Sequence, residues 1–579
     1  MAGLFFIPAV VAAVCVLMRL VYRSLLPKRL PGIPCNKDSS TRLLGDTSYF
    51  MEIRKSGGFW LHFFTDLLSN NKTPIAQFFP GPLSGNNVVI GDYREARDLM
   101  TKRNKDLGRG YKNIVTWQGV LPGHIIGMES FHPSYKEASF LTKDLMTPNF
   151  LHRVSAPASY KTVSNFIKLW KVKAAMADGL PFEAADDLEG LTYDIITAAA
   201  FGAAEENSQT LERLRAVQKA EKADSRDNGS FRLALFPRVE KPELLAALNV
   251  LTNRAGTAFQ ALFPKIALIL NGLRPSVRHA YRSKGEIIQS YIDLAVKKLS
   301  RGGSNEEFHS AVDYVVSREA SAAESAGRRP VFNSIYINDM LAGYLVAGQD
   351  STHSTLSFAV KYLTAHQDVQ SKLRSALRFA YPEADEQGRQ PTVEEVLKTQ
   401  IPFLDAFIEE TLRMVPPAAA ITRQVLCDMT VFGNFIPKGT LITFLLTGPT
   451  MTMAGAEVEE TKRGELPHKI SSEGVDDWSQ SPFPPGEFQP ERWLRADESG
   501  NVKYDSMAGP FLSFGSGPRG CWGKRLAYLE LKLVVTLLVW NLEFMRLPDG
   551  MEDDGIIKGL VTKPKLCCVK LRNTTSSTS

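Results

Sequence analysis

Cysteine is scarce in this chain, which has six cysteines among 579 residues. That number excludes a disulfide-stapled scaffold, the device of short secreted proteins. Dense runs of lysine and arginine are also missing, and 68 basic against 62 acidic residues leave a net charge of only +6. Such a balance does not indicate a nucleic-acid partner. The 44% of hydrophobic and 22% of charged residues are typical of a folded globular protein, not of a disordered or polytopic membrane protein.

The N-terminus has a composition of its own. Residues 2–18 carry no charge, and this apolar run has the length of a short membrane span. Four basic residues follow closely, Arg19, Arg23, Lys28 and Arg29, and the first acidic residue of the chain is Asp38. The positive-inside rule therefore predicts a single-pass anchor over residues 1–24, with the remaining chain in the cytosol. A cleaved signal peptide, which would need basic residues before the run, and a buried core helix are the alternatives.

The remaining chain reads as one domain over residues 41–570, because we find neither repeats nor a linker in it. Prolines predict a stiff hinge over residues 25–40, between the anchor and this domain. The hydrophobic periodicity predicts a mainly α fold with a small β region. The expected elements are a strand, a turn and a helix over 86–100, helices over 151–220, a loop at 321–330, and a long helix from about Ile335 to Gln367.

Three further segments stand out by composition. Residues 451–486 are polar and predict a surface insertion, and residues 571–579 predict a disordered tail. Residues 231–273 are unusually apolar, which fits a segment at a membrane surface, the roof of an apolar pocket, or an ordinary core helix.

The segment that carries chemistry runs from Phe514 to Gly523 and reads Phe-Gly-Ser-Gly-Pro-Arg-Gly-Cys-Trp-Gly. Cys521 precedes a long apolar helix pattern, where free N–H groups and the helix dipole favour a thiolate. The glycines permit a tight turn and a close approach to a large flat group, and Arg519 can pair with an anion on that group. A metal held by one thiolate fits haem iron better than zinc, which needs further ligands at short spacing. The alternative is a buried structural cysteine in a glycine-rich turn.

This segment resembles the haem-binding loop of the cytochrome P-450 family. All five defining positions of that loop are present: Phe514, Gly517, Arg519, Cys521 and Gly523. The resemblance implies a heme b (iron protoporphyrin IX) cofactor, with the thiolate of Cys521 as the axial iron ligand. It also implies the family fold.

Two more segments resemble motifs of the same family. Glu410 and Arg413 lie three residues apart, which places both on one helix face, and their apolar context is similar to the family's buried ExxR pair. The segment Phe488-Gln-Pro-Glu-Arg492-Trp is similar to the family's FxPER segment. The resemblance implies that Glu410, Arg413 and Arg492 form a structural triad, which fixes the loop of Cys521 against the helix behind it. A surface ion pair is the alternative for Glu410 and Arg413 alone.

A fourth motif lies inside the long predicted helix, where Ala347-Gly-Gln-Asp-Ser-Thr352 resembles the family's oxygen-activation segment. The resemblance implies that Asp350 and Ser351 supply protons during oxygen activation. Serine stands where the family usually has threonine, so Thr352 is a second candidate for the relay hydroxyl. Gly348 is expected to let the helix widen beside the haem, since glycine in a helix costs about 1 kcal/mol relative to alanine. Taken alone, the run from Gly348 to Thr352 is also typical of a helix start.

The resemblance extends to the groups that hold the haem propionates. Arg423 corresponds to the arginine of the family's β region that contacts a propionate, and Arg519 is the second partner. The tryptophan and arginine that an earlier helix of the family usually adds are not evident in residues 132–150. Lys136 or Lys143 is expected to take their place.

Together these resemblances imply a haem-thiolate monooxygenase that inserts one oxygen atom of O2 into an apolar small molecule. Anchor and hinge are similar to microsomal eukaryotic members, and segment 345–385 to filamentous-fungal ones, many of them in secondary metabolism. The implied location is the endoplasmic reticulum membrane, and the implied electron donor is an NADPH–cytochrome reductase. Lys524 and Arg525 form either its docking face or an ordinary solvated surface. The alternatives are an oxygen-independent isomerase or dehydratase, which NADPH-independent turnover would reveal, and a non-enzymatic membrane-tethered haem-binding protein.

Overall fold

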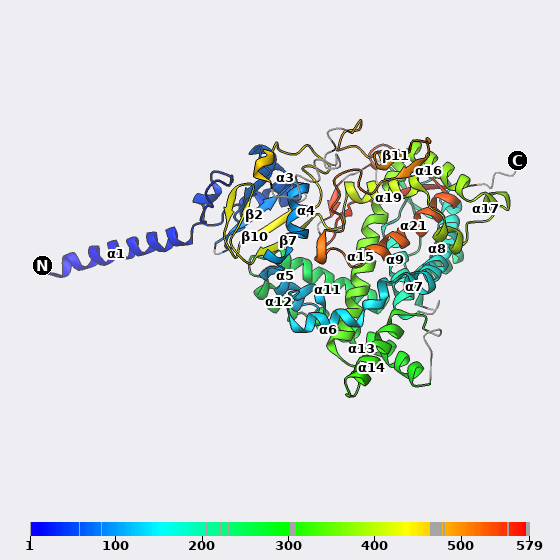
Figure 1. Ribbon diagram of the computed structural model, residues 1–579, viewed down its shortest axis with the longest axis horizontal. Coiled ribbons are helices and arrows are strands. Elements are labelled where there is room, and N and C mark those ends of the chain that lie inside the picture. Colours follow the sequence, from blue (N-terminus) through cyan, green and yellow to red (C-terminus); the bar gives the residue numbers. More distant parts are fainter. Residues whose placement is uncertain are drawn as a thin grey trace. The chain divides into compact units, whose positions relative to one another are not determined.

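The computed structural model describes residues 2–56, 58, 60–82, 84–202, 207–220, 222–227, 231–301, 308–463, 478, 481–552, 555–557 and 559–574. The protein is mainly helical with some sheet, as predicted (Figure 1). It divides into two compact units, each built from two stretches of the chain. The sheet unit holds Met1–Gly110 and Ala420–Asp477, and the helical unit holds Tyr111–Ala419 and Trp478–Ser579.

The sheet unit is organised around a five-stranded mixed sheet. Its elements are α1 (Ala2–Leu25), α2 (Thr47–Lys55), α3 (Leu61–Asn70), β1 (Ile75–Gln77), β2 (Asn87–Ile90), α4 (Tyr93–Thr101), β3 (Leu107–Gly108), β7 (Ala420–Val425), β8 (Met429–Val431), β9 (Asn434–Ile436) and β10 (Leu441–Leu445).

The strand order in this sheet is β1-β2-β10-β7-β3. Strand β10 pairs parallel with β2 and antiparallel with β7, where Ile442 lies opposite Arg423. All four residues of β2 are buried, which fits the apolar Val88-Val89-Ile90 run. Helix α4 begins where the Asp92 carboxylate accepts the Glu95 N–H at 2.9 Å. The predicted strand, turn and helix over 86–100 are therefore confirmed.

The N-terminal segment forms helix α1. None of the helices in the described part of the chain is both long and apolar enough to cross a membrane. The predicted single-pass anchor over residues 1–24 is thus not confirmed. The side chains of α1 from Val10 to Tyr22 are largely exposed.

The proline-rich segment after α1 is fastened to the sheet. The buried Gln77 side chain accepts the Leu30 N–H at 2.9 Å and donates to the carbonyl oxygens of Leu30 and Ile33 at 3.0 and 2.6 Å. The Gln77 backbone N–H adds a bond to Pro34 O at 2.8 Å. Residues 30–34 of the predicted hinge over 25–40 are therefore tied to β1, and the domain boundaries at 24 and 40 stay predictions.

The helical unit contains most of the helices. They are α5 (Tyr111–Gln118), α6 (Pro133–Leu141), α7 (Pro148–Phe150), α8 (Ala156–Met176), α9 (Ala185–Phe201), α10 (Gln209–Lys219), α11 (Glu243–Gln260), α12 (Pro264–Gly272), α13 (Pro275–Ser300), α14 (Ala311–Ser325), α15 (Ile335–Ala365), α16 (Gln367–Ala380), α17 (Pro382–Glu386), α18 (Val393–Lys398), α19 (Pro402–Met414) and α21 (Lys524–Asn541).

Short strands complete this unit. They are β4 (Phe182–Glu183), β5 (Asp224–Asp227), β6 (Arg232–Leu235), β11 (Leu494–Ala496), β12 (Val502–Tyr504), β13 (Leu542–Met545), β14 (Ile556–Ile557), β15 (Lys563–Pro564) and β16 (Cys568–Asn573). The largest of their sheets has the order β13-β16-β4, so that the last strand lies between two earlier ones.

The long helix α15 is close to its predicted limits and packs against α9, α19 and α21 (Figure 1). It begins at Ser334, whose hydroxyl accepts the Tyr336 N–H at 3.2 Å. Helical geometry is continuous through Gly348, so the predicted widening is not found. A Cβ on Gly348 would lie 2.5 Å from Ile196 Cδ1 of α9. The glycine is therefore explained by close packing of α9 on α15.

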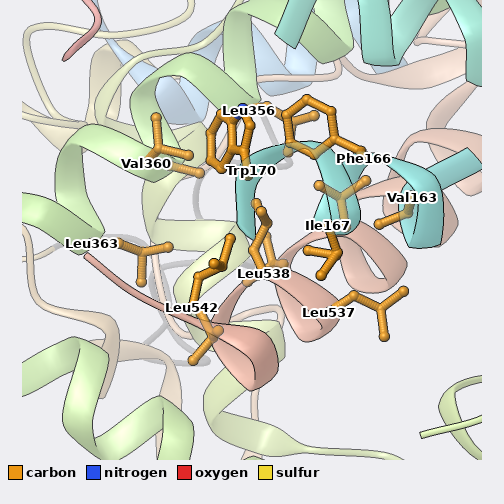
Figure 2. Close-up of a cluster of buried hydrophobic side chains, with 14 of the residues drawn as sticks. Val163, Phe166, Ile167, Trp170, Leu356, Val360, Leu363, Leu537, Leu538 and Leu542 are labelled. Atoms are coloured by element: carbon orange, nitrogen blue, oxygen red, sulfur yellow. The ribbon is translucent and has the colours of Figure 1, made fainter. Parts of the chain in front are cut away.

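The main core joins α8, α15 and α21. Figure 2 shows Phe166 and Trp170 of α8 with Leu356 and Val360 of α15 and Leu538 of α21. All five side chains are almost completely buried. Replacing one such aromatic residue by alanine costs about 3–5 kcal/mol. This core fixes the position of α21, and therefore of the loop that precedes it.

Three further expectations differ from the structure. Helix α14 continues to Ser325, so the loop begins five residues later than the predicted start at residue 321. Strand β16 continues to Asn573, inside the range predicted as a disordered tail, because it pairs with β13. Residues 464–477 and 479–480 of the predicted insertion and the tail residues 575–579 lie outside the described residues. Within the apolar segment 231–273, α11 is half buried, whereas α12 is largely exposed.

Candidate active site

The segment around Cys521 folds into a tight loop before α21. The Cys521 N–H donates to Phe514 O at 2.7 Å, and the Gly520 N–H donates to Gly517 O at 2.9 Å. Gly515 and Gly517 adopt φ angles of 64° and 70°, in the left-handed region that side-chain-bearing residues rarely enter. The glycines of the motif therefore have the role predicted for them, which is to allow a tight turn.

The Cys521 thiol is free and lies at an accessible position of the loop. Protein atoms crowded around the sulfur raise the pKa of this thiol, and the Gly523 N–H and the Lys524 ammonium oppose that rise. The predicted preference for a thiolate is thus only partly met by the protein itself. A bound metal ion would supply the missing positive charge, since a coordinating thiol is deprotonated outright.

The donor set fits a haem iron. Within the described residues, no three His, Cys, Asp or Glu side chains lie close enough together to hold a metal ion. Cys521 would therefore be a lone protein ligand, as haem-thiolate iron requires and zinc does not. A Cβ added to Gly523 would lie 4.0 Å from the Cys521 sulfur, so the glycine adds no side-chain bulk there.

Aromatic side chains pack against the loop that carries Cys521. The Phe514 ring lies 5.2 Å from the Tyr528 ring of α21 and 6.2 Å from the Phe511 ring, measured between centroids. The Lys524 ammonium lies 5.4 Å above the Phe514 ring. Phe514 therefore packs the loop against α21.

Arg519 is bound by residues of an earlier segment. Its guanidinium donates to Ile125 O at 3.3 Å and to Met128 O at 3.0 Å, and it lies 4.7 Å above the Tyr135 ring. Sequence reasoning missed Tyr135, although it lies in the segment where a substitute for the family's tryptophan was sought. Lys136 and Lys143, the two predicted substitutes, are exposed.

The predicted triad forms one buried network. Glu410 accepts hydrogen bonds from Arg413 Nε at 2.7 Å and from Arg492 Nε at 2.9 Å. The side chains of Glu410 and Arg492 are completely buried, and Arg413 is 1% exposed. The indole N–H of Trp493 donates to the same carboxylate at 2.9 Å. Sequence reasoning placed the three charged residues together but did not include Trp493.

Two connections link this network to the cysteine loop. The Ser513 hydroxyl donates to Leu412 O at 2.7 Å, inside the ExxR turn of α19. The Trp493 ring meets the Phe511 ring edge-on, with centroids 5.8 Å apart. Because Phe511 contacts Phe514, the buried network is continuous with the loop that carries Cys521.

The three polar residues of the α15 motif face different neighbours. Asp350 forms an ion pair with Lys563 at 2.5 Å. The Ser351 hydroxyl donates to Ala347 O at 2.6 Å, within its own helix. The Thr352 hydroxyl donates to Glu530 Oε2 of α21 at 3.1 Å. Three consecutive residues therefore serve three separate contacts.

Two carboxyl groups of the site region have strongly shifted pKa values. Burial raises the pKa of Glu530 to about 8, against the opposing effect of the Thr352 hydroxyl. Burial also raises the pKa of Glu409 to about 7, and the Tyr528 hydroxyl, which donates to Glu409, opposes the rise. Glu530 is thus mainly protonated at neutral pH. Neither group was singled out from the sequence, because Glu530 is a lone glutamate in an apolar helix and Glu409 stands beside Glu410, which the ExxR spacing selects instead.

The remaining predicted haem contact, Arg423, belongs to the sheet unit. It is buried in β7, and its guanidinium donates to Thr422 O at 2.9 Å. Within the helical unit, the structure brings together Phe514, Arg519, Cys521 and Gly523 in one loop.

Comparison with known proteins agrees with this geometry. The family model for cytochrome P450 matches residues 50–450 and 483–571. The chain belongs to the cytochrome P450 family. This P450 is 30% identical over 576 residues to cytochrome P450 monooxygenase TRI13 of Fusarium sporotrichioides, which covers 95% of this chain and 96% of that relative. It is 31% identical over 540 residues to cytochrome P450 monooxygenase xilC of Penicillium rubens, covering 92% and 90% of the two chains.

A shorter match is informative as well. The Hps1-dma1 cluster cytochrome P450 monooxygenase cyp3.1 of Dothistroma septosporum is 36% identical over 313 residues, or 51% of this chain and 98% of that relative. The predicted resemblance to fungal members is confirmed by these relatives. The protein is an oxidoreductase of the monooxygenase class, whose family binds haem through a cysteine thiolate and uses O2, a redox partner and small-molecule substrates.

Proposed function

We propose that this P450 inserts one oxygen atom of O2 into an apolar small molecule, with Cys521 as the axial ligand of its haem. In that reaction, the second oxygen atom leaves as water, and two electrons and two protons are consumed. The observation that carries the proposal is the glycine-turn loop of Cys521, continuous with a fully buried Glu410–Arg413–Arg492 network. A lone thiol held so rigidly is suited to an axial ligand.

The bound haem would supply the electron-transfer and oxygen chemistry. The residues of this chain would hold it and provide protons. Cys521 supplies the sulfur, and the Gly523 N–H donates toward that sulfur. Arg519 and Arg423 are the proposed propionate partners, with Lys136 or Lys143 as a third. Asp350 and the Ser351 hydroxyl are the proposed route for protons.

We assign the substrate to the secondary metabolites of a fungus. This assignment is supported by the fungal relatives, one of which is named for the Hps1-dma1 cluster. An apolar substrate is proposed because small-molecule pockets are lined mainly by hydrophobic side chains.

An NADPH–cytochrome reductase is the proposed electron donor. Lys524 and Arg525 are exposed at the start of α21, three and four residues after the cysteine. Their positive charge suits an acidic partner. Lys524 also lies over the Phe514 ring, so the proposed docking face contacts the loop itself.

We also propose that the protein works at the endoplasmic reticulum membrane, with its catalytic part in the cytosol. Two exposed apolar surfaces support this. One is α1, and the other is the segment around α12, where these side chains are exposed: Leu262, Phe263, Ile266, Ile269, Leu270 and Leu273. Apolar side chains on a helix surface, flanked by basic residues, favour a lipid interface.

The axial ligand is tested by Cys521→Ser, with Cys427→Ser as a matched control on a second exposed cysteine. The reduced carbon monoxide complex of Cys521→Ser should lose the thiolate-type absorption, since a hydroxyl is a much poorer iron donor at neutral pH. Cys427→Ser should keep it. If Cys521→Ser keeps both the spectrum and NADPH-dependent turnover, Cys521 is not the ligand.

A further inference from the structure

The guanidinium of Arg254 lies inside the helical unit without an acidic partner among the described residues. Arg254 belongs to α11, which packs against α5, α12 and α13, and it is 9% exposed. Its Nε donates to Gly119 O at 3.4 Å, and its Cζ lies 5.8 Å from the centre of the Tyr281 ring. Nη1 is buried, and no described residue offers it a hydrogen-bond partner. Because arginine keeps its charge inside a protein, a buried cation is left here with little compensation.

The acidic side chain beside this junction of helices is bound by another cation. Asp339 of α15 forms an ion pair with Lys284 of α13 at 2.6 Å, and it accepts the Gly123 N–H at 2.8 Å. Asp339 and Arg254 act in opposite directions on the same hydroxyl, since burial and Asp339 raise the pKa of Tyr281 and Arg254 opposes the rise. These groups carry two positive charges and one negative charge. One positive charge therefore remains for a further anion.

The open end of the guanidinium faces a glycine. A Cβ on Gly272, the last residue of α12, would lie 3.4 Å from Arg254 Nη1, 3.5 Å from Nη2 and 3.9 Å from Cζ. These distances place that point in front of both Nη atoms, close to the guanidinium plane. An anion at this end accepts hydrogen bonds from both nitrogen atoms, which is the bidentate geometry that arginine forms with carboxylates. Because residue 272 is a glycine, its own side chain does not occupy this end.

One segment, residues 119–128, connects Arg254 with the cysteine loop. The carbonyl of its first residue accepts from Arg254. In its middle, His124 packs closely on α15, where a Cβ on Gly343 would lie 2.2 Å from the imidazole Cδ2. At its end, two carbonyl groups accept hydrogen bonds from Arg519. The segment therefore runs from the unpaired cation, over the long helix, to a proposed propionate partner of the haem.

Apolar side chains fill the remaining part of this junction. Helices α5, α11, α12 and α15 contribute Trp117, Leu251, Leu268 and Leu341 to one buried hydrophobic cluster. A neutral polar molecule would gain nothing from such surroundings. A molecule with an apolar body and one anionic end would match both the hydrocarbon and the cation.

We propose that Arg254 is a specificity-determining residue, which binds a carboxylate at one end of an otherwise apolar substrate. This role rests on the proposed function and narrows its substrate class to apolar acids. A neutral analogue would leave the buried guanidinium unpaired, whereas a carboxylate would accept hydrogen bonds from both Nη atoms. The headgroup of an anionic lipid offers the same charge, and the experiment separates it from a substrate.

The test measures binding by isothermal titration calorimetry at pH 7.5, with haem-loaded full-length protein. The probes are two matched pairs, dodecanoate with dodecanol and naphthoate with naphthamide, in which only the first member is charged. The variants are Arg254→Met, which keeps an apolar stem, and Arg254→Lys, which keeps the charge without the fork. Arg278→Met is the matched control, because Arg278 is exposed on α13 and donates to the carbonyl of Leu273, the residue after Gly272.

The unaltered protein should bind the acid of at least one pair at least about tenfold more tightly than its neutral partner. Arg254→Met should lose this preference, Arg254→Lys should keep part of it, and Arg278→Met should keep all of it. The proposal is overturned if the unaltered protein prefers neither acid, or if Arg254→Met keeps the preference. Calorimetry needs no turnover, so this result is independent of the proposed function, which fails instead if the unaltered protein forms no oxygenated product with NADPH and a reductase.

Thermal unfolding separates ligand binding from a structural role of Arg254. A buried charge without a counter-ion destabilises a fold, so ligand-free Arg254→Met should melt at the temperature of the unaltered protein or above it. The preferred acid should raise the melting temperature of the unaltered protein but not that of Arg254→Met. A fall of several degrees in ligand-free Arg254→Met would show that the guanidinium supports the fold, and would overturn the proposal.

Vesicle binding identifies the source of the anion. Arg254→Met should bind vesicles of phosphatidylcholine, with and without phosphatidylserine, as tightly as the unaltered protein does. If Arg254→Met instead loses binding to the vesicles that contain phosphatidylserine, Arg254 binds a lipid headgroup and the proposal is overturned.

Discussion

Replacing Glu410 with glutamine is the sharpest test of the buried network behind the cysteine loop. The carboxylate of Glu410 accepts two hydrogen bonds from Arg413, at 2.7 and 2.8 Å, and one from Arg492 at 2.9 Å. It also accepts the Trp493 indole N–H and the Gln489 backbone N–H, each at 2.9 Å. Glutamine has nearly the same shape, but it removes the negative charge that bonds both guanidinium groups and turns an NH2 group toward their donors.

The magnitude follows from complete burial of the network. Removing one member of a buried ion pair costs about 3–5 kcal/mol, because it leaves uncompensated charge. The helical unit has about 400 residues, and an unfolding entropy of about 2.1 cal/mol/K per residue corresponds to roughly 0.9 kcal/mol/K. Glu410→Gln should therefore lower the melting temperature of this unit by about 3–6 °C. The arginines also keep carbonyl partners, among them Pro484, Pro485 and Glu487, which keep the loss from being larger.

The assay is thermal unfolding of haem-loaded protein at pH 7.5, followed by circular dichroism, together with the haem content after purification. Glu409→Gln is the matched control, since it makes the same change one residue away on α19. The control should melt at the same temperature or higher, because burial already disfavours the charge of Glu409. If Glu410→Gln melts within about 1 °C of the unaltered protein, the buried network does not stabilise the cysteine loop.

Three further predictions concern pH, proton supply and the N-terminus. Burial raises the pKa of Glu409 to about 7 in the folded protein, against an ordinary 4.5, so the contribution of this group to stability is full below pH 4.5 and declines as the pH rises to 7. Between these two pH values, the free energy of unfolding of Glu409→Gln should therefore fall by about 3 kcal/mol less than that of the unaltered protein, as measured by urea unfolding. Ser351→Ala should lower the product formed per NADPH and raise peroxide release. Thr352→Ala should keep product formation coupled to NADPH but lose about 1–3 kcal/mol of stability, because it removes the hydrogen bond to buried Glu530. If Thr352→Ala uncouples the reaction in the same assay and Ser351→Ala does not, Thr352 is the relay hydroxyl. Deleting residues 2–24 should release much of the protein from membranes and leave the carbon monoxide spectrum intact, and a truncated protein without haem would contradict this.

The fold was predictable where the sequence pattern is long and regular. The 31 helical residues of α15 repeat an apolar pattern over many turns, and the predicted limits differ from the observed ones by two residues. The loop expected at 321–330 was misplaced because alanines at its start are strong helix formers, which extend α14 to Ser325. The end of β16 was missed because its partner strand, β13, contributes nothing to the local composition of the C-terminus.

In the candidate site, too, local motifs were predictable from the sequence and contacts with distant residues were not. Glu410, Arg413 and Arg492 are recognisable because their types recur at fixed spacing within short motifs. The Asp350–Lys563 contact and the role of Gly348 are not, because the partner residue in each case lies far away in the chain and belongs to no motif. A local pattern predicts that a residue matters, but only packing decides what it contacts.

The interleaved order of the helical unit has a consequence for synthesis on the ribosome. Glu183 in β4 pairs with Cys568 in β16, and Ser354 on α15 binds Thr562. At about 5–20 residues per second, β4 leaves the ribosome tens of seconds before its partner strand exists. During that interval, Phe182 and the edge of β4 lack the cover that β16 provides, so the nascent chain offers chaperones an apolar edge for most of its synthesis. Truncations before β16 should therefore accumulate as aggregates, even though every motif of the active site is already present in them.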